Sequence, residues 1–125
     1  MLDVAALLFF LLGLAHSVLG ERYILTRLFR RQDLPKLFGG TKFTTRTLRF
    51  AWHITTVAWW GLAALLVLAQ RGQLSPANAL STIFWVCVAS ALLPLLITRR
   101  RHLSWVVLLV IAALVYFSGA IQASV

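Results

Sequence analysis

The sequence predicts an all-α integral membrane protein, a bundle of four transmembrane helices in up-down-up-down order. Two observations lead to this prediction. Hydrophobic residues make up 61% of the 125 residues and charged residues only 12%, whereas about a quarter of the residues in an ordinary soluble domain are charged. The apolar residues also fall into four long runs, none of which contains an acidic residue, a lysine or an arginine. A soluble core of this size could not enclose so much apolar side chain, so we expect the runs to lie in lipid.

The four runs cover residues 4–19, 50–69, 79–97 and 103–121. Each is long enough to cross a hydrocarbon core of about 30 Å as a helix. A backbone inside hydrocarbon must satisfy its own hydrogen bonds, which leaves helices or a closed β-barrel, and runs this continuous do not alternate as barrel strands do. Because the later connections are short, we expect antiparallel neighbours in one domain, residues 1–125.

The positive charges predict the orientation of these helices. The first connection contains eight of the 12 lysine and arginine residues and the third contains three, whereas the second contains only Arg71. Cationic loops usually stay on the cytoplasmic side, so we expect both termini on the periplasmic side of a bacterial cytoplasmic membrane. The net charge of +9 is then explained by contact with anionic lipid headgroups, and no nucleic-acid partner is expected.

The connection over residues 21–49 has an amphipathic pattern. Apolar side chains recur there at helical spacing, at Ile24, Leu25, Leu28 and Phe29. This pattern predicts that the first helix continues out of the membrane and bends onto its surface, with its cations among headgroups. Asp33 resembles an N-cap and Pro35 a first-turn proline, which predicts a second short helix over residues 34–38. A docking surface for a partner or an acidic lipid is the alternative function of this connector.

Histidines are the residues best suited to carry chemistry. The predicted topology brings His16, His53 and His102 into the cytoplasmic half, and Glu21 adds a carboxylate near the same level. Ionisable groups inside a membrane usually face the bundle interior, where they pair, relay protons or bind ligands. Imidazole and carboxylate suit transition metals, and two histidines can ligate a haem iron. We therefore expect a metal ion or haem on His16 and His53, with Glu21 and His102 as further metal ligands.

The histidine spacing leaves other functions open, because it matches no compact ligand motif such as H-E-x-x-H. The histidines could instead form interhelical hydrogen bonds alone, or line a path for protons or substrate. In that case the protein would be a small transporter or channel working as a homodimer, or an accessory structural subunit of a membrane complex. Glu21 could pair with Arg49 or Arg22 rather than with His16, which lies about 140° away around the helix. Nothing in the sequence predicts an enzymatic activity.

Small and aromatic residues indicate how the helices pack. Gly13 and Ser17 form a small-x-x-x-small pair, which would let another helix approach closely, within the bundle or across a dimer. Trp52 suits the cytoplasmic aromatic belt. Trp59 and Trp60 fall near mid-span, where we expect them to pack against another helix, with the face of a porphyrin or quinone as the alternative.

Three stretches in the first half of the chain form a further pattern. They are HSVLGERYIL from His16, LPKLFG from Leu34 and RFAWH from Arg49. Together they resemble a group of small uncharacterised bacterial inner-membrane proteins. The resemblance implies a four-helix membrane protein and brings no activity with it.

The charge distribution predicts the outcome of reporter fusions. A reporter enzyme that works only in the periplasm should be active when fused to either terminus or near Gly72. These sites adjoin the ends of the predicted helices that have few lysine and arginine residues. Fusions near Lys36 or Arg100 should be inactive. A fusion at the C-terminus that is active only in the cytoplasm would contradict the predicted orientation.

Overall fold

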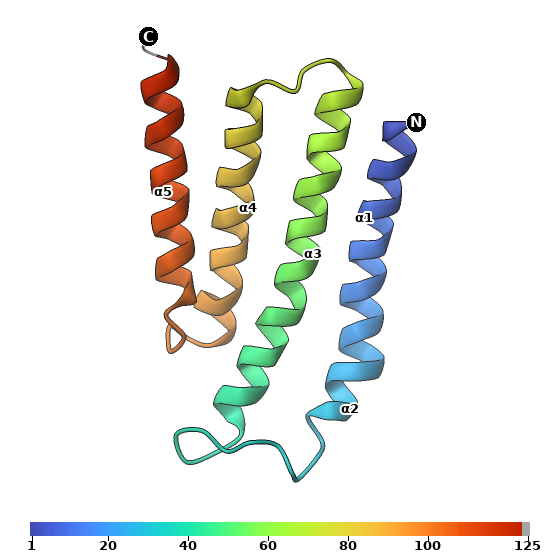
Figure 1. Ribbon diagram of the computed structural model, residues 1–125. Helices are drawn as coiled ribbons and strands as arrows, with labels where there is room; N and C mark the ends of the chain where they lie inside the picture. The colour runs from blue at the N-terminus through green and yellow to red at the C-terminus, as the bar shows by residue number, and fades with distance from the viewer. Residues whose placement is uncertain (124–125) are drawn as a thin grey trace.

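The computed structural model describes residues 1–123 and, in this range, consists of helices without a β-strand (Figure 1). The four main helices are α1 (Leu2–Leu19), α3 (Lys42–Gln70), α4 (Pro76–Ile97) and α5 (Ser104–Ala123). After α1 the helix continues as a π-helix, η1 (Gly20–Leu25), and ends with the short α2 (Thr26–Leu28). The helices run alternately up and down (Figure 1), so the predicted all-α fold of four helices is confirmed.

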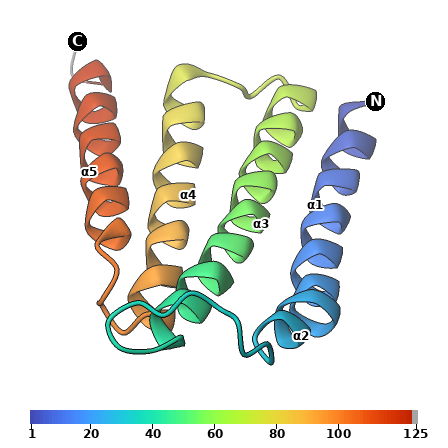
Figure 2. The same cartoon turned by 60° about the horizontal axis from the view of Figure 1, so that its bottom comes forward.

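The helices stand in a single row, in the order α1, α3, α4 and α5 (Figures 1 and 2). Contacts join α1 to α3, α3 to α4 and α4 to α5, and within residues 1–123 no contact joins α1 to α4 or α5. The prediction of an up-down-up-down bundle did not specify which helices pack together, and the structure arranges them in a row of successive neighbours.

Three helices are long and apolar enough to cross a membrane: Leu2–Leu28, Lys42–Gln70 and Pro76–Ile97. A shorter apolar helix covers Ser104–Gly119. Helix α4 begins at Pro76 because Ser75 caps it: the Ser75 hydroxyl accepts a hydrogen bond from the Asn78 amide at 3.2 Å, and proline suits a first helical turn.

The predicted short helix over residues 34–38 is wrong. The chain instead makes a tight turn in which Leu37 and Gly40 exchange two backbone hydrogen bonds, with Phe38 at φ 52° and Gly39 at φ 82°. Asp33 caps no helix, because the Arg31 guanidinium binds its carboxylate, with Nε donating to Oδ1 at 2.8 Å. This hydrogen bond lowers the pKa of Asp33 to about 2. The ion pair with Arg31 therefore replaces the expected N-cap.

Candidate functional site

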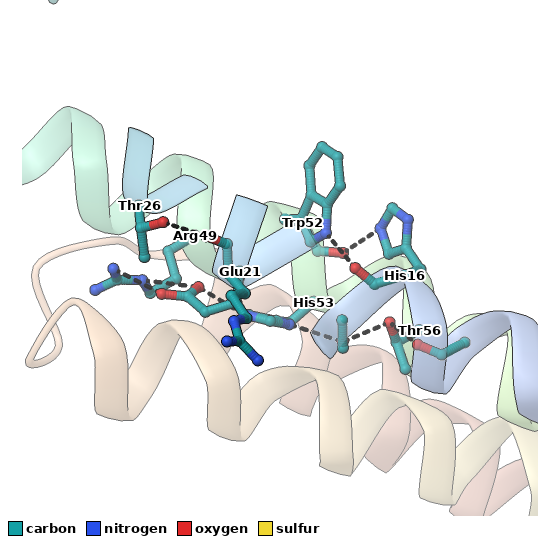
Figure 3. Close-up of polar contacts among 10 residues, drawn as sticks. His16, Glu21, Thr26, Arg49, Trp52, His53 and Thr56 are labelled. Carbon is teal, nitrogen blue, oxygen red and sulfur yellow. Dashed lines mark hydrogen bonds and ion pairs between the residues drawn. The ribbon is translucent and has the colours of Figure 1, made fainter. Parts of the chain in front are cut away.

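Five polar side chains form a continuous series of contacts between α1, η1 and α3 (Figure 3). In order they are Arg49, Glu21, His53, Ser17 and Thr56, and we call them the polar network. Arg49 Nη2 lies 2.9 Å from Glu21 Oε1, and the other carboxylate oxygen lies 3.3 Å from His53 Nε2. The Ser17 hydroxyl lies 2.8 Å from His53 Nδ1 and 2.8 Å from the Thr56 hydroxyl. Thr56 also reaches the Gly13 carbonyl at 3.2 Å.

The polar network leads from the protein surface into the contact between the helices. The side chains of Arg49 and Glu21 are 39% and 34% exposed, and that of His53 is 21% exposed. Thr56, at the other end, is only 3% exposed. A polar path thus connects a half-exposed ion pair with a buried hydroxyl.

Helix periodicity explains why these side chains meet. Arg49, His53 and Thr56 occupy positions i, i+4 and i+7 of α3, which lie on one face of a helix. Ser17 on α1 and Glu21 on η1 are four residues apart. In a regular α-helix, the Glu21 side chain would lie about 40° around the helix axis from that of Ser17. The wider turns of a π-helix reduce this offset, and η1 begins at Gly20, directly before Glu21. The π-helix thereby directs the carboxylate toward α3.

Gly13 on α1 and Gly20 at the start of η1 let α3 approach their backbone closely. Three side chains of α3 donate to α1 carbonyls: Trp52 to His16 at 3.0 Å, Thr56 to Gly13 at 3.2 Å and Trp60 to Phe10 at 3.2 Å. A Cβ atom at Gly13 would lie 2.7 Å from the Trp60 Nε1 atom, and one at Gly20 would overlap the Trp52 indole. The predicted close approach at Gly13 and Ser17 is therefore confirmed.

His16 lies beside the polar network but belongs to a separate contact. Its ring stacks on Trp52 with centroids 4.4 Å apart and planes 3° from parallel, and the edge of Trp59 approaches it at 5.0 Å. His16 Nε2 lies 3.2 Å from the Trp52 carbonyl oxygen, which can only accept, so Nε2 carries a proton. Trp52, which we expected in an aromatic belt, thus packs against α1, as do Trp59 and Trp60.

The four predicted metal ligands are not gathered at one point. Glu21 meets His53, but both ring nitrogens of His53 already have protein partners. His102 lies at the start of α5, where Nδ1 is 2.8 Å from the Ser104 hydroxyl and the ring stacks on Phe43. No group of three or more metal-binding side chains occurs in the described part of the chain. Metal or haem binding by these residues stays a prediction.

The network also includes residues that we did not predict as members of a site. Ser17 was singled out only for its small size, and Thr56 was not singled out. The sequence feature that could have identified them is their spacing from predicted site residues. Ser17 lies four residues before Glu21, and Thr56 lies three residues after His53. The predicted alternative of a Glu21–Arg49 pair is confirmed.

The directions of these hydrogen bonds depend on the protonation of His53. When Thr56 donates to the Gly13 carbonyl, its only hydroxyl proton is used, so Ser17 must donate to Thr56. Nδ1 of His53 must then carry a proton and donate it to Ser17. Because Nε2 faces the Glu21 carboxylate, a second proton is needed between His53 and Glu21. This arrangement therefore corresponds to a positively charged imidazole beside a carboxylate, or to neutral His53 beside a protonated Glu21.

The opposite arrangement suits neutral His53. Thr56 then donates to Ser17, Ser17 donates to Nδ1, and His53 keeps its single proton on Nε2, from which it donates to Glu21. The two arrangements differ by one proton and by the rotation of two hydroxyl groups. His53 is hydrogen-bonded through both ring nitrogens in each of them. Only the first arrangement keeps the hydrogen bond from Thr56 to the Gly13 carbonyl, whereas Ser17 joins α1 to α3 in both.

Comparison with protein-family models, with curated proteins and with solved structures finds no match for the chain. The resemblance to small bacterial inner-membrane proteins stays a prediction.

Nitrogen NMR of the histidine rings tests the proposed hydrogen-bond directions. In neutral His53 the proton should lie on Nε2, and acidification should add a proton to Nδ1 in a single step. Ser17→Ala should shift the Nδ1 resonance and lower stability by about 1 kcal/mol, because Nδ1 loses its partner. Ser118→Ala is the control, since Ser118 bonds only the Leu114 carbonyl of its own helix. A neutral His53 protonated on Nδ1 beside an ionised Glu21 would contradict the assignment.

Proposed function

We propose that this protein is a small multi-pass transporter of the bacterial cytoplasmic membrane that moves protons through the polar network. The proposal has two parts, which rest on different observations. The first part is insertion of the helix row into a membrane, with the network near the cytoplasmic surface. The second is proton exchange by His53.

The apolar surface of the row supports membrane insertion. Large hydrophobic side chains are exposed along the helices, among them Leu8, Leu12, Trp85 and Leu114. Exposed apolar surface of this extent indicates contact with lipid or another protein. The connections before α3 and before α5, which carry many of the positive charges, lie at the same end of the row (Figure 2). The positive-inside rule would place this end, with the polar network, in the cytoplasmic leaflet.

The single observation that supports proton transfer is that the network has two hydrogen-bonded arrangements differing by one proton. Carboxylates and imidazoles inside membranes commonly form proton relays. In this proposal His53 carries the exchangeable proton, because its two ring nitrogens contact Ser17 and Glu21, while Arg49 pairs with Glu21 at 2.9 Å. The neighbouring helix α4 contributes no acidic or basic side chain. Protonated His53 is therefore compensated chiefly by Glu21, with Arg49 opposing it.

The inner end of the network indicates a transporter rather than an open channel. Beyond Thr56, Trp60 stacks on Phe10 with ring centroids 5.4 Å apart and donates to its carbonyl. Both rings are partly exposed, Phe10 at 46% and Trp60 at 39%, and the series of hydroxyl and imidazole groups ends before them. We therefore expect slow, saturable proton transfer. Metal or haem binding ranks behind this function, because His53 would first have to give up Ser17 or Glu21.

Proton movement into liposomes tests the proposal. The purified protein should be reconstituted with a pH-sensitive dye inside, and a potassium gradient with valinomycin should drive proton entry. We expect the parent to exceed His53→Gln by about tenfold, because glutamine retains hydrogen-bonding groups but carries no exchangeable charge. His102→Gln is the matched control outside the network and should behave like the parent.

Two results would contradict proton transfer. The parent could give the same rate as protein-free liposomes, or His53→Gln could transfer protons as fast as the parent. In the first case, a normal thermal stability for the parent and a reduced one for His53→Gln would assign the network to helix packing. Metal or haem content at stoichiometric levels, lost in both His16→Ala and His53→Ala, would instead support the predicted cofactor site.

A further inference from the structure

A hollow of about 690 Å³ lies apart from the polar network, between the turn that precedes α3 and the α4–α5 connection. Its lining includes Leu37, Phe38, Thr41, Lys42, Phe43 and Arg101. These residues come from two segments that are far apart in the sequence. The hollow is thus formed by the fold at the end of the row that bears the cationic connections.

Two uncompensated positive charges line the hollow. Lys42 and Arg101 are both exposed. Among the described residues, the cationic members of the ion pairs are Arg31, Arg49 and His53. Neither Lys42 nor Arg101 takes part in one of these pairs. The lining contains no acidic residue, and nearby in sequence Asp33 is bound by Arg31. The hollow therefore favours an anionic ligand.

The other side of the hollow is apolar and exposed. Phe38 is a large hydrophobic residue that is 88% exposed, and its neighbour Leu37 is 48% exposed. The double hydrogen bond between Leu37 and Gly40 fixes the turn that presents it. The Phe38 ring meets Phe43 edge-on at 5.0 Å, so the two aromatic rings form a continuous apolar wall. A phosphate alone would contact the cations and leave this wall in water.

We propose that the hollow binds one acidic phospholipid of the phosphatidylglycerol type. Its phosphate lies between Lys42 and Arg101, and an acyl chain covers Phe38 and Phe43. Pockets of this size that are largely apolar, with a few placed polar groups, are typical of small-molecule sites. Basic pockets at the cytoplasmic ends of membrane helices bind anionic headgroups. The proposal rests on membrane insertion but is independent of proton transfer through His53.

Native mass spectrometry of the detergent-purified protein tests this site. With equal amounts of phosphatidylglycerol and phosphatidylcholine, the parent should retain one phosphatidylglycerol with a preference of about tenfold or more. The double variant Lys42→Gln/Arg101→Gln should lose this preference. The matched control is Arg27→Gln/Arg30→Gln, which removes the same charge from the same end of the row but outside the hollow, and it should keep the lipid.

Further arms of the experiment separate a lipid from other anions and from general surface charge. Phe38→Ser should weaken binding of phosphatidylglycerol, and inorganic phosphate should not displace the lipid. Equal loss of lipid in the two double variants would overturn the specific site, as would equal binding of the two lipids. Displacement of the lipid by inorganic phosphate at a concentration comparable to that of the lipid would contradict the proposal, because the acyl chain would then contribute nothing to binding. Circular dichroism should show unchanged helix content in each variant.

Discussion

The contact between α1 and α3 depends on backbone carbonyls of α1 that accept hydrogen bonds from side chains of α3. Gly13 and Gly20 make this possible, because any side chain there would occupy the space of Trp60 or Trp52. Among the side chains that the structure describes, none forms a hydrogen bond between α3 and α4 or between α4 and α5. There, close packing such as that of Gly61 on Val86 joins the helices. The row thus consists of one polar contact and two apolar ones.

This division places the chemistry of the molecule between α1 and α3. Buried polar groups need hydrogen-bond partners, and in the polar network each hydroxyl and the His53 imidazole find a partner on the opposite helix. The π-helix that begins at Gly20 adds Glu21 to this contact, and Arg49 holds the carboxylate in place. In the proposed function, the same bonds that join the helices also form the path along which a proton is exchanged.

The sequence predicts the helices much better than their arrangement. Long apolar runs indicate four helices, and the topology correctly places His16, Glu21 and His53 near one another along the row. The runs give no signal for which face packs, because apolar side chains surround each helix, and so the open row was not predicted. Asp33 was predicted as an N-cap, but an arginine two residues earlier competes for its carboxylate. The role of Thr56 depends on α3 facing α1, which only the structure supplies.

The proposed proton transfer requires that Glu21 and His53 interact directly and share an exchangeable proton. A double-mutant cycle on thermal stability, with Glu21→Gln, His53→Gln and the combined variant, measures this interaction most directly. We expect a coupling free energy of about 1 kcal/mol or more, because His53 Nε2 lies 3.3 Å from the Glu21 carboxylate and hydrogen bonds to a carboxylate are stronger than those between neutral groups. Additive effects, within about 0.3 kcal/mol, would contradict a direct interaction.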